Sequence, residues 1–547
     1  MKNFRLITSI VILFFAFACD KQFIENEKIA LNPTKPESSA QFSGLREEAS
    51  QINDQFMVLG RKLKNPYTIE NMKKALENIN ANRPDKLQLN IKPNYLYVRF
   101  LPKNEEEYAL LNRDKNLELY NYPLDYEIVK RGNSYRDSSI KDGSFSWKYA
   151  AVKVEYDFPK IQHEILSELY LPDKDDELKN KYSNLIDVLD NEALRLSDNL
   201  PEKKLKNTKV ASWIPNGQIQ MFDDVKNMNV PIKGCKVRTR RWFSTESTLT
   251  DNWGYYNIGV SYNNPANHEI LWSRADFDIL NSDLDIAVFN GPEQSTPWSL
   301  VIISGKSRLY AVTHRAAYEY YYNNFTLTTP GYTRLSVRDE NEQNYRPGLS
   351  NQFNPGGFKI KIWTKIDDAN NNNLGYRYRS CLETFGTVIH ELGHNVHYLI
   401  NTTGYNFGSS AVAESWGEGV KWHFTSIEYG KCGDAVFVGS SPSSPLAYSD
   451  PTNFTDNFQR RFDAPYYISQ SLSPIDYTPI VIDLIDNFNQ ETSFGAMYAN
   501  DNVSGYSIVE FQQAIRYNDT WGTVRDYLTS HSSNPQTAAV NILFSQW

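Results

Sequence analysis

Cysteine is scarce in this sequence, which has only four among 547 residues. One of them, Cys19, follows an apolar N-terminal run, so Cys235, Cys381 and Cys432 remain for the folded chain. An odd number of thiols at such low density excludes a disulfide framework, and at most one pair can form. The fold must therefore depend on hydrophobic cores, for which the length of the chain and its many Tyr, Phe and Trp residues provide ample material.

Excess positive charge is also absent, because the formal net charge at pH 7 is -8. An acidic balance argues against nucleic acid as a partner, since phosphate backbones are bound by clustered Lys and Arg. The basic run Lys236–Arg241 is interrupted by Val237 and Thr239. We interpret it as the solvent-facing side of a strand.

Long apolar runs are missing except at the N-terminus, where Lys2 and Arg5 precede Leu6–Phe17. This pattern is typical of a secretory signal over residues 1–18, and the run is too short for a transmembrane helix. The sequence Ala16–Cys19 resembles a bacterial lipobox with alanine in place of the usual leucine. The resemblance implies a lipid on Cys19, a polar tether over residues 19–50, and an extracytoplasmic protein anchored at the outer membrane or cell surface. The alternative is an ordinary cleaved signal or an internal cysteine.

Periodicity divides the rest of the chain into three parts, which together predict a multidomain α+β fold. Residues 51–212 mix segments of helical periodicity with segments of strand periodicity, which predicts an α/β module. Residues 47–82 and Glu105–Asn112 are predicted to be helical, and Tyr95–Phe100 is predicted to be a strand. Residues 213–298 change to short strands with polar turns and resemble the transthyretin-like, carboxypeptidase-regulatory β-sandwich. Residues 299–547 contain the motifs described below. We expect the protein to be a monomer.

Three aromatic residues in the second part have two interpretations. Trp242, Trp253 and Tyr255 occur among alternating positions, which favours burial in a β-sheet core. The alternative is a set of exposed rings that stack on sugars.

A metal-site motif lies in a predicted helix over residues 380–400. Ser380 and Glu383 have the spacing of a capping box, and an apolar stripe follows at helical spacing. His390 and His394 are four residues apart, so both imidazoles can face one zinc ion at roughly 2.0–2.1 Å. Glu391, one position further along, can reach a water on the ion without binding the metal, which suits a general base.

A catalytic zinc needs a third protein ligand and an open position. Glu414 is the natural candidate, because it lies in a second predicted helix that Ser410 would cap. Glu418 is four residues further on the same face and can accept a hydrogen bond from a liganding histidine. We expect His397 to be a supporting or surface histidine rather than a fourth ligand.

The motif His390-Glu391-Leu392-Gly393-His394, followed after nineteen residues by Glu414, resembles the gluzincin metallopeptidases, and the spacing is similar to the thermolysin branch. The Gly393 form is also similar to enhancin-like mucin-active peptidases. The resemblance implies a zincin catalytic domain over residues 299–547 with a mostly helical C-terminal lobe. It further implies an edge strand at Phe358–Trp363 that holds a peptide substrate.

The resemblance also implies that Tyr405 stabilises the oxyanion. Five other residues compete for this role: His423, Tyr448, Tyr466, Tyr467 and His531.

These observations predict a zinc metallopeptidase that hydrolyses peptide bonds in a protein or glycoprotein substrate. Two alternatives stay open. One is a surface lipoprotein that binds glycans or protein through an inactive peptidase fold. The other, within the enzyme class, is an enhancin-like peptidase of mucin glycoproteins. A chance occurrence of the His-Glu-x-x-His pattern is the competing explanation of the motif itself.

Overall fold

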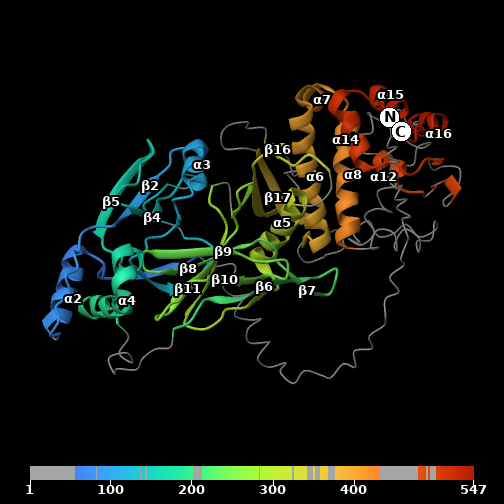
Figure 1. Cartoon of the computed structure of the whole chain (residues 1–547). Helices are drawn as coiled ribbons and strands as arrows, with labels where there is room; N and C mark the ends of the chain where they lie inside the picture. The colour runs from blue at the N-terminus through green and yellow to red at the C-terminus, as the bar shows by residue number, and fades with distance from the viewer. Residues whose placement is uncertain are drawn as a thin grey trace, which may run out of the picture. The chain divides into compact units, whose positions relative to one another are not determined.

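The computed structural model describes residues 56–546, except for 82, 136, 142–143, 201–211, 282–283, 323–325, 342–348, 351–357, 368–375, 430–477, 488, 490 and 493–499. Helices and strands are interspersed along these ranges, which gives a mixed α+β fold (Figure 1). The expected signal over residues 1–18, Cys19 and the tether over residues 19–50 lie outside the described ranges. Among the described residues, no helix combines the length and apolar character needed to cross a membrane.

The N-terminal region is built on the antiparallel sheet β4-β2-β5, beside a two-stranded pair β1-β3. The predicted strand at Tyr95 and helix at Glu105 are confirmed, whereas the helix predicted over residues 47–82 begins only at Ile69. The segment before it forms strand β1, because it pairs with a strand some seventy residues later that local periodicity does not reveal. The elements are β1 (Val58–Lys62), α2 (Ile69–Ala81), β2 (Tyr95–Leu101), α3 (Glu105–Arg113), β3 (Tyr126–Lys130), β4 (Lys148–Lys153), β5 (Gln162–Leu169), the short 3-10 helix η1 (Pro172–Lys174) and α4 (Asp176–Leu196).

Two four-stranded sheets follow, in the orders β10-β6-β14, with β7 also paired to β6, and β13-β11-β8-β9. Alternate side chains of both sheets, among them Ile219 and Ile270, belong to one hydrophobic core. The strands are β6 (Asn216–Asp223), β7 (Met228–Pro231), β8 (Lys236–Arg241), β9 (Ser244–Leu249), β10 (Tyr255–Asn257), β11 (Ala266–Leu271), β13 (Val288–Gln294) and β14 (Leu300–Ile302).

The basic run on β8 is a strand, but the prediction that it faces solvent is wrong. Arg238 is 1% exposed and its guanidinium pairs with the carboxylate of Glu269. It also donates to the backbone oxygen of Leu119 at 2.8 Å, and Arg241 lies 2.9 Å from the carboxylate of Asp190. These arginines therefore form ion pairs and hydrogen bonds inside the protein, and several of their partners come from the N-terminal region.

A five-stranded sheet has the order β12-β15-β17-β16, and β18 also pairs with β17. Its central pairs β12-β15 and β15-β17 are parallel. β17 contains the predicted strand at Phe358, but it lies inside the sheet, since β16 and β18 cover its other side near its two ends. The edge-strand prediction is therefore wrong at Lys359 and Ile360, where β16 pairs, whereas Lys361–Trp363 have no partner on that side among the described residues. The elements are β12 (Phe277–Leu280), α5 (Gly305–Tyr322), β15 (Thr333–Asn341), β16 (Leu349–Ser350), β17 (Phe358–Asp367) and β18 (Tyr376–Tyr378).

The C-terminal part of the described chain is helical, and its hydrophobic side chains join the core of the β-sheets before residue 298. The expected mostly helical character is seen in the described residues after 479, where helices begin at Ile480, Ile508 and Trp521. The helices are α6 (Cys381–Ile400), α7 (Thr402–Phe407), α8 (Ser410–Glu428), α12 (Ile480–Ile485), α14 (Ile508–Tyr517), α15 (Trp521–His531) and α16 (Thr537–Phe544).

A buried histidine on α5 predicts how stability depends on pH. His314 is 1% exposed and its Nε2 lies 2.9 Å from the Lys233 carbonyl oxygen. Burial lowers the pKa of His314 to about 4. The unfolded chain therefore binds more protons than the folded chain between pH 4 and pH 6.5, so this residue reduces the free energy of unfolding as pH falls through that window, by about 3 kcal/mol in total.

His314→Gln is expected to flatten the pH dependence of stability by about 2–3 kcal/mol between pH 7 and pH 4. Denaturant unfolding at several pH values measures this, in a buffer that contains a chelator throughout. His531→Gln, which changes an exposed histidine, is the matched control. Equal pH slopes for the wild-type protein and His314→Gln would contradict the prediction.

Candidate metal centre

Helix α6 begins with the capping box that the sequence predicts. The Ser380 side chain accepts a hydrogen bond from the backbone N–H of Glu383, whose carboxylate accepts one from the backbone N–H of Ser380 at 2.9 Å. The apolar stripe of the helix is buried along most of its length, with Phe385, Ile389 and Leu392 all inaccessible to solvent. The cap and the buried stripe fix where α6 begins and which face it turns inward, which directs the two histidines of the motif.

Helix α8 packs against α6 and supplies the third candidate ligand. The indole N–H of Trp416 on α8 donates to the backbone oxygen of Gly393 on α6 at 2.9 Å. Trp416 is fully buried, so this bond fixes the register between the two helices. The N-cap of α8 is Ser409, without a capping side-chain hydrogen bond, so the prediction of Ser410 as the cap is wrong.

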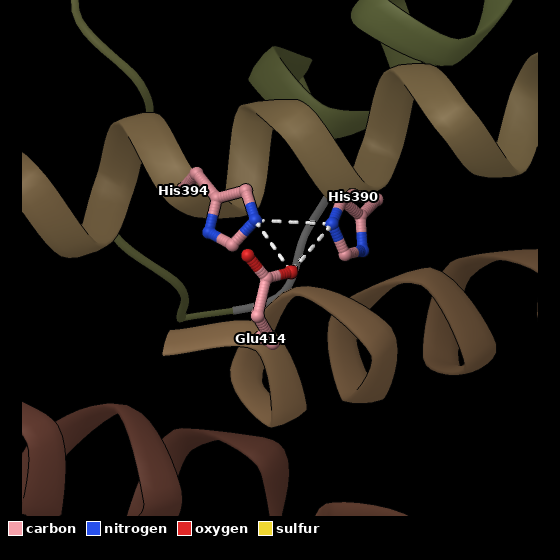
Figure 2. A group of neighbouring side chains, drawn as sticks. All are labelled: His390, His394 and Glu414. Carbon is pink, nitrogen blue, oxygen red and sulfur yellow. Dashed lines mark hydrogen bonds and ion pairs between the residues drawn. The ribbon is translucent and has the colours of Figure 1, made fainter. Parts of the chain in front are cut away.

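Three side chains from these helices converge on one point (Figure 2). The Nε2 atoms of His390 and His394 are 3.0 Å apart, and Oε2 of Glu414 lies 3.4 Å from the first and 3.3 Å from the second. Two imidazole nitrogens at this distance repel each other unless one carries a hydrogen or a cation lies against both. The sequence predicted these three residues as the ligand set, and their donor atoms are arranged as a group that can hold a metal ion.

The close approach of the helices depends on glycine at position 417. A Cβ atom added there would lie 2.7 Å from Cε1 of His390 and 2.8 Å from its Nδ1. Gly393, on the opposite helix, is less restricted, since its added Cβ would come no nearer than 3.6 Å to Cα of Gly417. Sequence reasoning did not single out Gly417, although its position between Glu414 and Glu418 was a signal.

Glu418 lies behind His390, on the side away from the converging donors. Its Oε1 is 3.1 Å from Nδ1 of His390, and Lys421 Nζ lies 2.9 Å from its Oε2. An Nδ1–H bond to this carboxylate leaves the lone pair on Nε2, which is the atom that faces His394 and Glu414. Lys421, which the sequence reasoning missed, balances the charge of Glu418.

The electrostatics of the group favour a cation. Burial opposes protonation of His390, but Glu414 and Glu418 outweigh it and raise the pKa of His390 to about 10. Burial likewise opposes ionisation of Glu414, yet hydrogen bonds with His390 and His394 hold its pKa well below the usual range. The two carboxylates thus remain ionised, and they stabilise positive charge at the imidazoles.

Glu391 lies one residue after the first ligand and is 5% exposed. Burial raises the pKa of its carboxyl group, while the neighbouring histidines oppose the rise. Glu391 does not belong to the three donors that converge. Its carboxylate interacts electrostatically with His390, His394 and Glu414, so it is close to the group without belonging to it.

Tyr405, on the short helix α7, lies next to the group. Its ring centroid is 5.8 Å from that of His394 and 5.6 Å from that of His397. Burial, and then the charges of Glu391 and Glu414, raise the pKa of Tyr405 to about 12. The phenol therefore keeps its hydrogen at neutral pH and can donate it in a hydrogen bond.

The other candidates for the oxyanion-stabilising role predicted for Tyr405 lie elsewhere in the structure or outside the described residues. His423 is nine residues from Glu414 on α8, about 13 Å along the helix axis. His531 is exposed on α15 and stacks on Tyr527. Tyr448, Tyr466 and Tyr467 lie outside the described residues, as does Cys432. His397 is 1% exposed, so the surface interpretation of this residue is wrong, and its ring lies beside that of Tyr405.

A second group with metal-ligand chemistry consists of Asp223, Asp224 and Cys381. Both carboxylates are already occupied, because Arg315 and Arg308 each lie 3.0 Å from one of them. Burial raises the pKa of the Cys381 thiol, which disfavours the thiolate that metals bind. This group is therefore an ion-pair cluster at the start of α6.

Comparisons with known proteins add no family to this picture. No protein-family model matches the sequence, and a search of curated proteins finds no similar sequence. The converging donors of His390, His394 and Glu414 therefore carry the functional argument alone.

Proposed function

We propose that this protein is a zinc-dependent peptidase of the gluzincin type, held outside the cytoplasm by a lipid on Cys19. One observation carries the proposal: the donor atoms of His390, His394 and Glu414 are separated by 3.0–3.4 Å. Ligands at about 2.1 Å from a tetrahedral ion are separated by about 3.4 Å. Two imidazoles and one carboxylate in this spacing fit zinc, and three protein ligands leave a position for the reaction.

In this proposal each residue of the site has one task. When bound, zinc supplies a Lewis acid that polarises the scissile carbonyl and makes water acidic near neutral pH. The Glu391 carboxylate takes the proton from the attacking water and returns it to the leaving amine. Tyr405 donates its hydroxyl hydrogen to the developing oxyanion, and Glu418 holds His390 in the tautomer that leaves Nε2 as the donor.

The finer architecture belongs to the same proposal. We assign residues 51–212 to an N-terminal α/β module, 213–298 to a transthyretin-like sandwich and 299–547 to the catalytic domain. Strands β12 and β14 link the last two, since β12 pairs with β15 and β14 pairs with β6. The proposed substrate is a protein or glycoprotein, mucin glycoproteins included, and the enzyme acts as a monomer. A surface protein that binds such ligands with an inactive site is the competing function.

Metal analysis and cleavage together test this function. The purified protein is incubated with excess zinc and desalted, and its metal content is measured by elemental analysis. We expect about one zinc per chain, with cleavage of a peptide or glycoprotein library that a chelator abolishes and added zinc restores. A folded protein that retains no zinc would contradict the proposal and favour the binding protein, and so would one that retains zinc but cleaves nothing.

A further inference from the structure

Two aromatic side chains, separated in sequence by Gly254, are exposed at the turn that leads into β10 and at the first residue of that strand. Trp253 is 68% exposed and Tyr255 is 54% exposed, whereas the side chain of Tyr256, on β10, belongs to the core and is 4% exposed. The core interpretation of Trp253 and Tyr255 is therefore wrong. Trp242 differs from them, since it is partly buried and its ring packs near Tyr67 and Phe243.

The turn that carries the two rings is fixed by its own hydrogen bonds. The Asp251 carboxylate accepts from the backbone N–H groups of Trp253 and Tyr255, both at 2.9 Å. Gly254 has φ = +79°, and a Cβ added to it would lie 2.4 Å from the backbone oxygen of Ile219. The rings are thus presented by a backbone that lies tightly against β6, which reduces the entropy lost when a ligand binds.

Amide side chains accompany the rings on the outer face of β6 and β10. Ile219 and Met221 of β6 point into the core, so the alternate, partly exposed residues lie on the opposite face. Gln218 pairs with Tyr255 in register and donates its amide to the Trp253 backbone oxygen at 2.9 Å. We call this surface the amide face; it comprises Asn216, Gln218, Gln220, Trp253, Tyr255 and Asn257.

We propose that the amide face binds neutral glycans. None of its described side chains carries a charge at neutral pH, and the nearby Asp251 carboxylate is engaged with backbone amides. Asn216 and Gln218 each donate one hydrogen bond to a backbone oxygen, and Asn257 accepts one from the Gly259 N–H. Each of these bonds uses only one of the several donor and acceptor positions of a primary amide, and sugar hydroxyls require both kinds. Aromatic faces stack on the C–H faces of sugar rings. A polyanion or an anionic membrane surface needs Lys and Arg instead, and these are missing from this face. The site is separate from the metal centre and does not depend on zinc.

Titration calorimetry with defined oligosaccharides tests the proposal on the full protein. The neutral probes are cellotetraose, an N-acetylglucosamine tetramer and a galactose tetramer, and a heparin octasaccharide is the anionic probe. We expect at least one neutral probe to bind with a Kd on the order of 1 mM or lower. Trp253→Ala is expected to weaken that binding by about tenfold or more, and Tyr255→Ala by a smaller factor.

Two control variants make the outcome specific. Tyr517→Ala removes a ring that is 66% exposed on α14, and His394→Ala removes a candidate zinc ligand; both are expected to leave the Kd for the neutral probe unchanged. Thermal unfolding confirms that Trp253→Ala is folded. The proposal is overturned if no neutral probe binds, if Trp253→Ala binds as well as the wild-type protein, or if heparin alone binds.

Discussion

Replacing Glu391 by glutamine is expected to reduce kcat/KM for peptide cleavage by about 10²- to 10⁴-fold while the zinc content is unchanged. Glutamine has nearly the same shape as glutamate but cannot take a proton from water. Glu391 is absent from the three converging donors, so the donor set stays intact in the variant. Cleavage rates and elemental analysis on the same preparation measure both quantities.

His394→Ala is the matched comparison for Glu391→Gln. Because Nε2 of His394 lies 3.0 and 3.3 Å from the other two donors, its removal opens the donor set. We expect this variant to lose zinc and activity together. Zinc loss in Glu391→Gln, or cleavage by either variant at the wild-type rate, would show that the roles are assigned wrongly.

Replacing Gly417 by alanine is the second prediction with a large expected effect. The added methyl group would lie 2.7 Å from Cε1 of His390, which is closer than real Cβ contacts allow. His390 cannot move freely, since Glu418 binds its Nδ1 at 3.1 Å and Glu414 faces its Nε2. Overpacking of this kind costs about 1–3 kcal/mol, so we expect zinc affinity to fall by about 10- to 100-fold. Competition with a chromophoric chelator measures the affinity.

Gly393→Ala provides the control for this substitution. Its added Cβ would make only ordinary contacts, the nearest at 3.6 Å, and alanine favours a helix more than glycine does. We expect unchanged zinc affinity and equal or higher thermal stability. If Gly417→Ala and Gly393→Ala bind zinc equally well, the close contact with His390 does not shape the site.

The features of this site that the sequence predicts are the local ones. Ser380 and Glu383 define the start of α6 through bonds within one helical turn, and His390 and His394 share a face because of their spacing. Glu414 is a less direct case, since its approach to the histidines depends on how α8 packs on α6. Glu414 was predicted because a catalytic zinc needs a third ligand and because the residue lies on a second predicted helix, and the resemblance to gluzincins agreed with that choice.

The errors come from contacts between distant segments. β17 has the alternation of an edge strand, but alternation does not show that β16 and β18 pair with its second side. Trp253 and Tyr255 have the spacing of core residues, yet the tight turn at Gly254 directs both of them outward. The position of Gly417 between Glu414 and Glu418 marks it as part of the site but does not reveal its steric role, because the steric limit comes from a ring on another helix.

The buried arginines of β8 limit where this chain can be cut. Arg238 and Arg241 have carboxylate partners at Glu118 and Asp190, which precede residue 212. A fragment that begins after residue 212 would lose both partners and the ring of Tyr120, over which the Arg238 guanidinium lies at 3.8 Å. In such a fragment the guanidinium groups of Arg238 and Arg241, and the surface that contacts the N-terminal region in the full protein, would be exposed to solvent. We therefore expect the part of the chain after residue 212 to be less stable alone than in the full protein, because Arg238 would keep only Glu269 and Arg241 would lose Asp190.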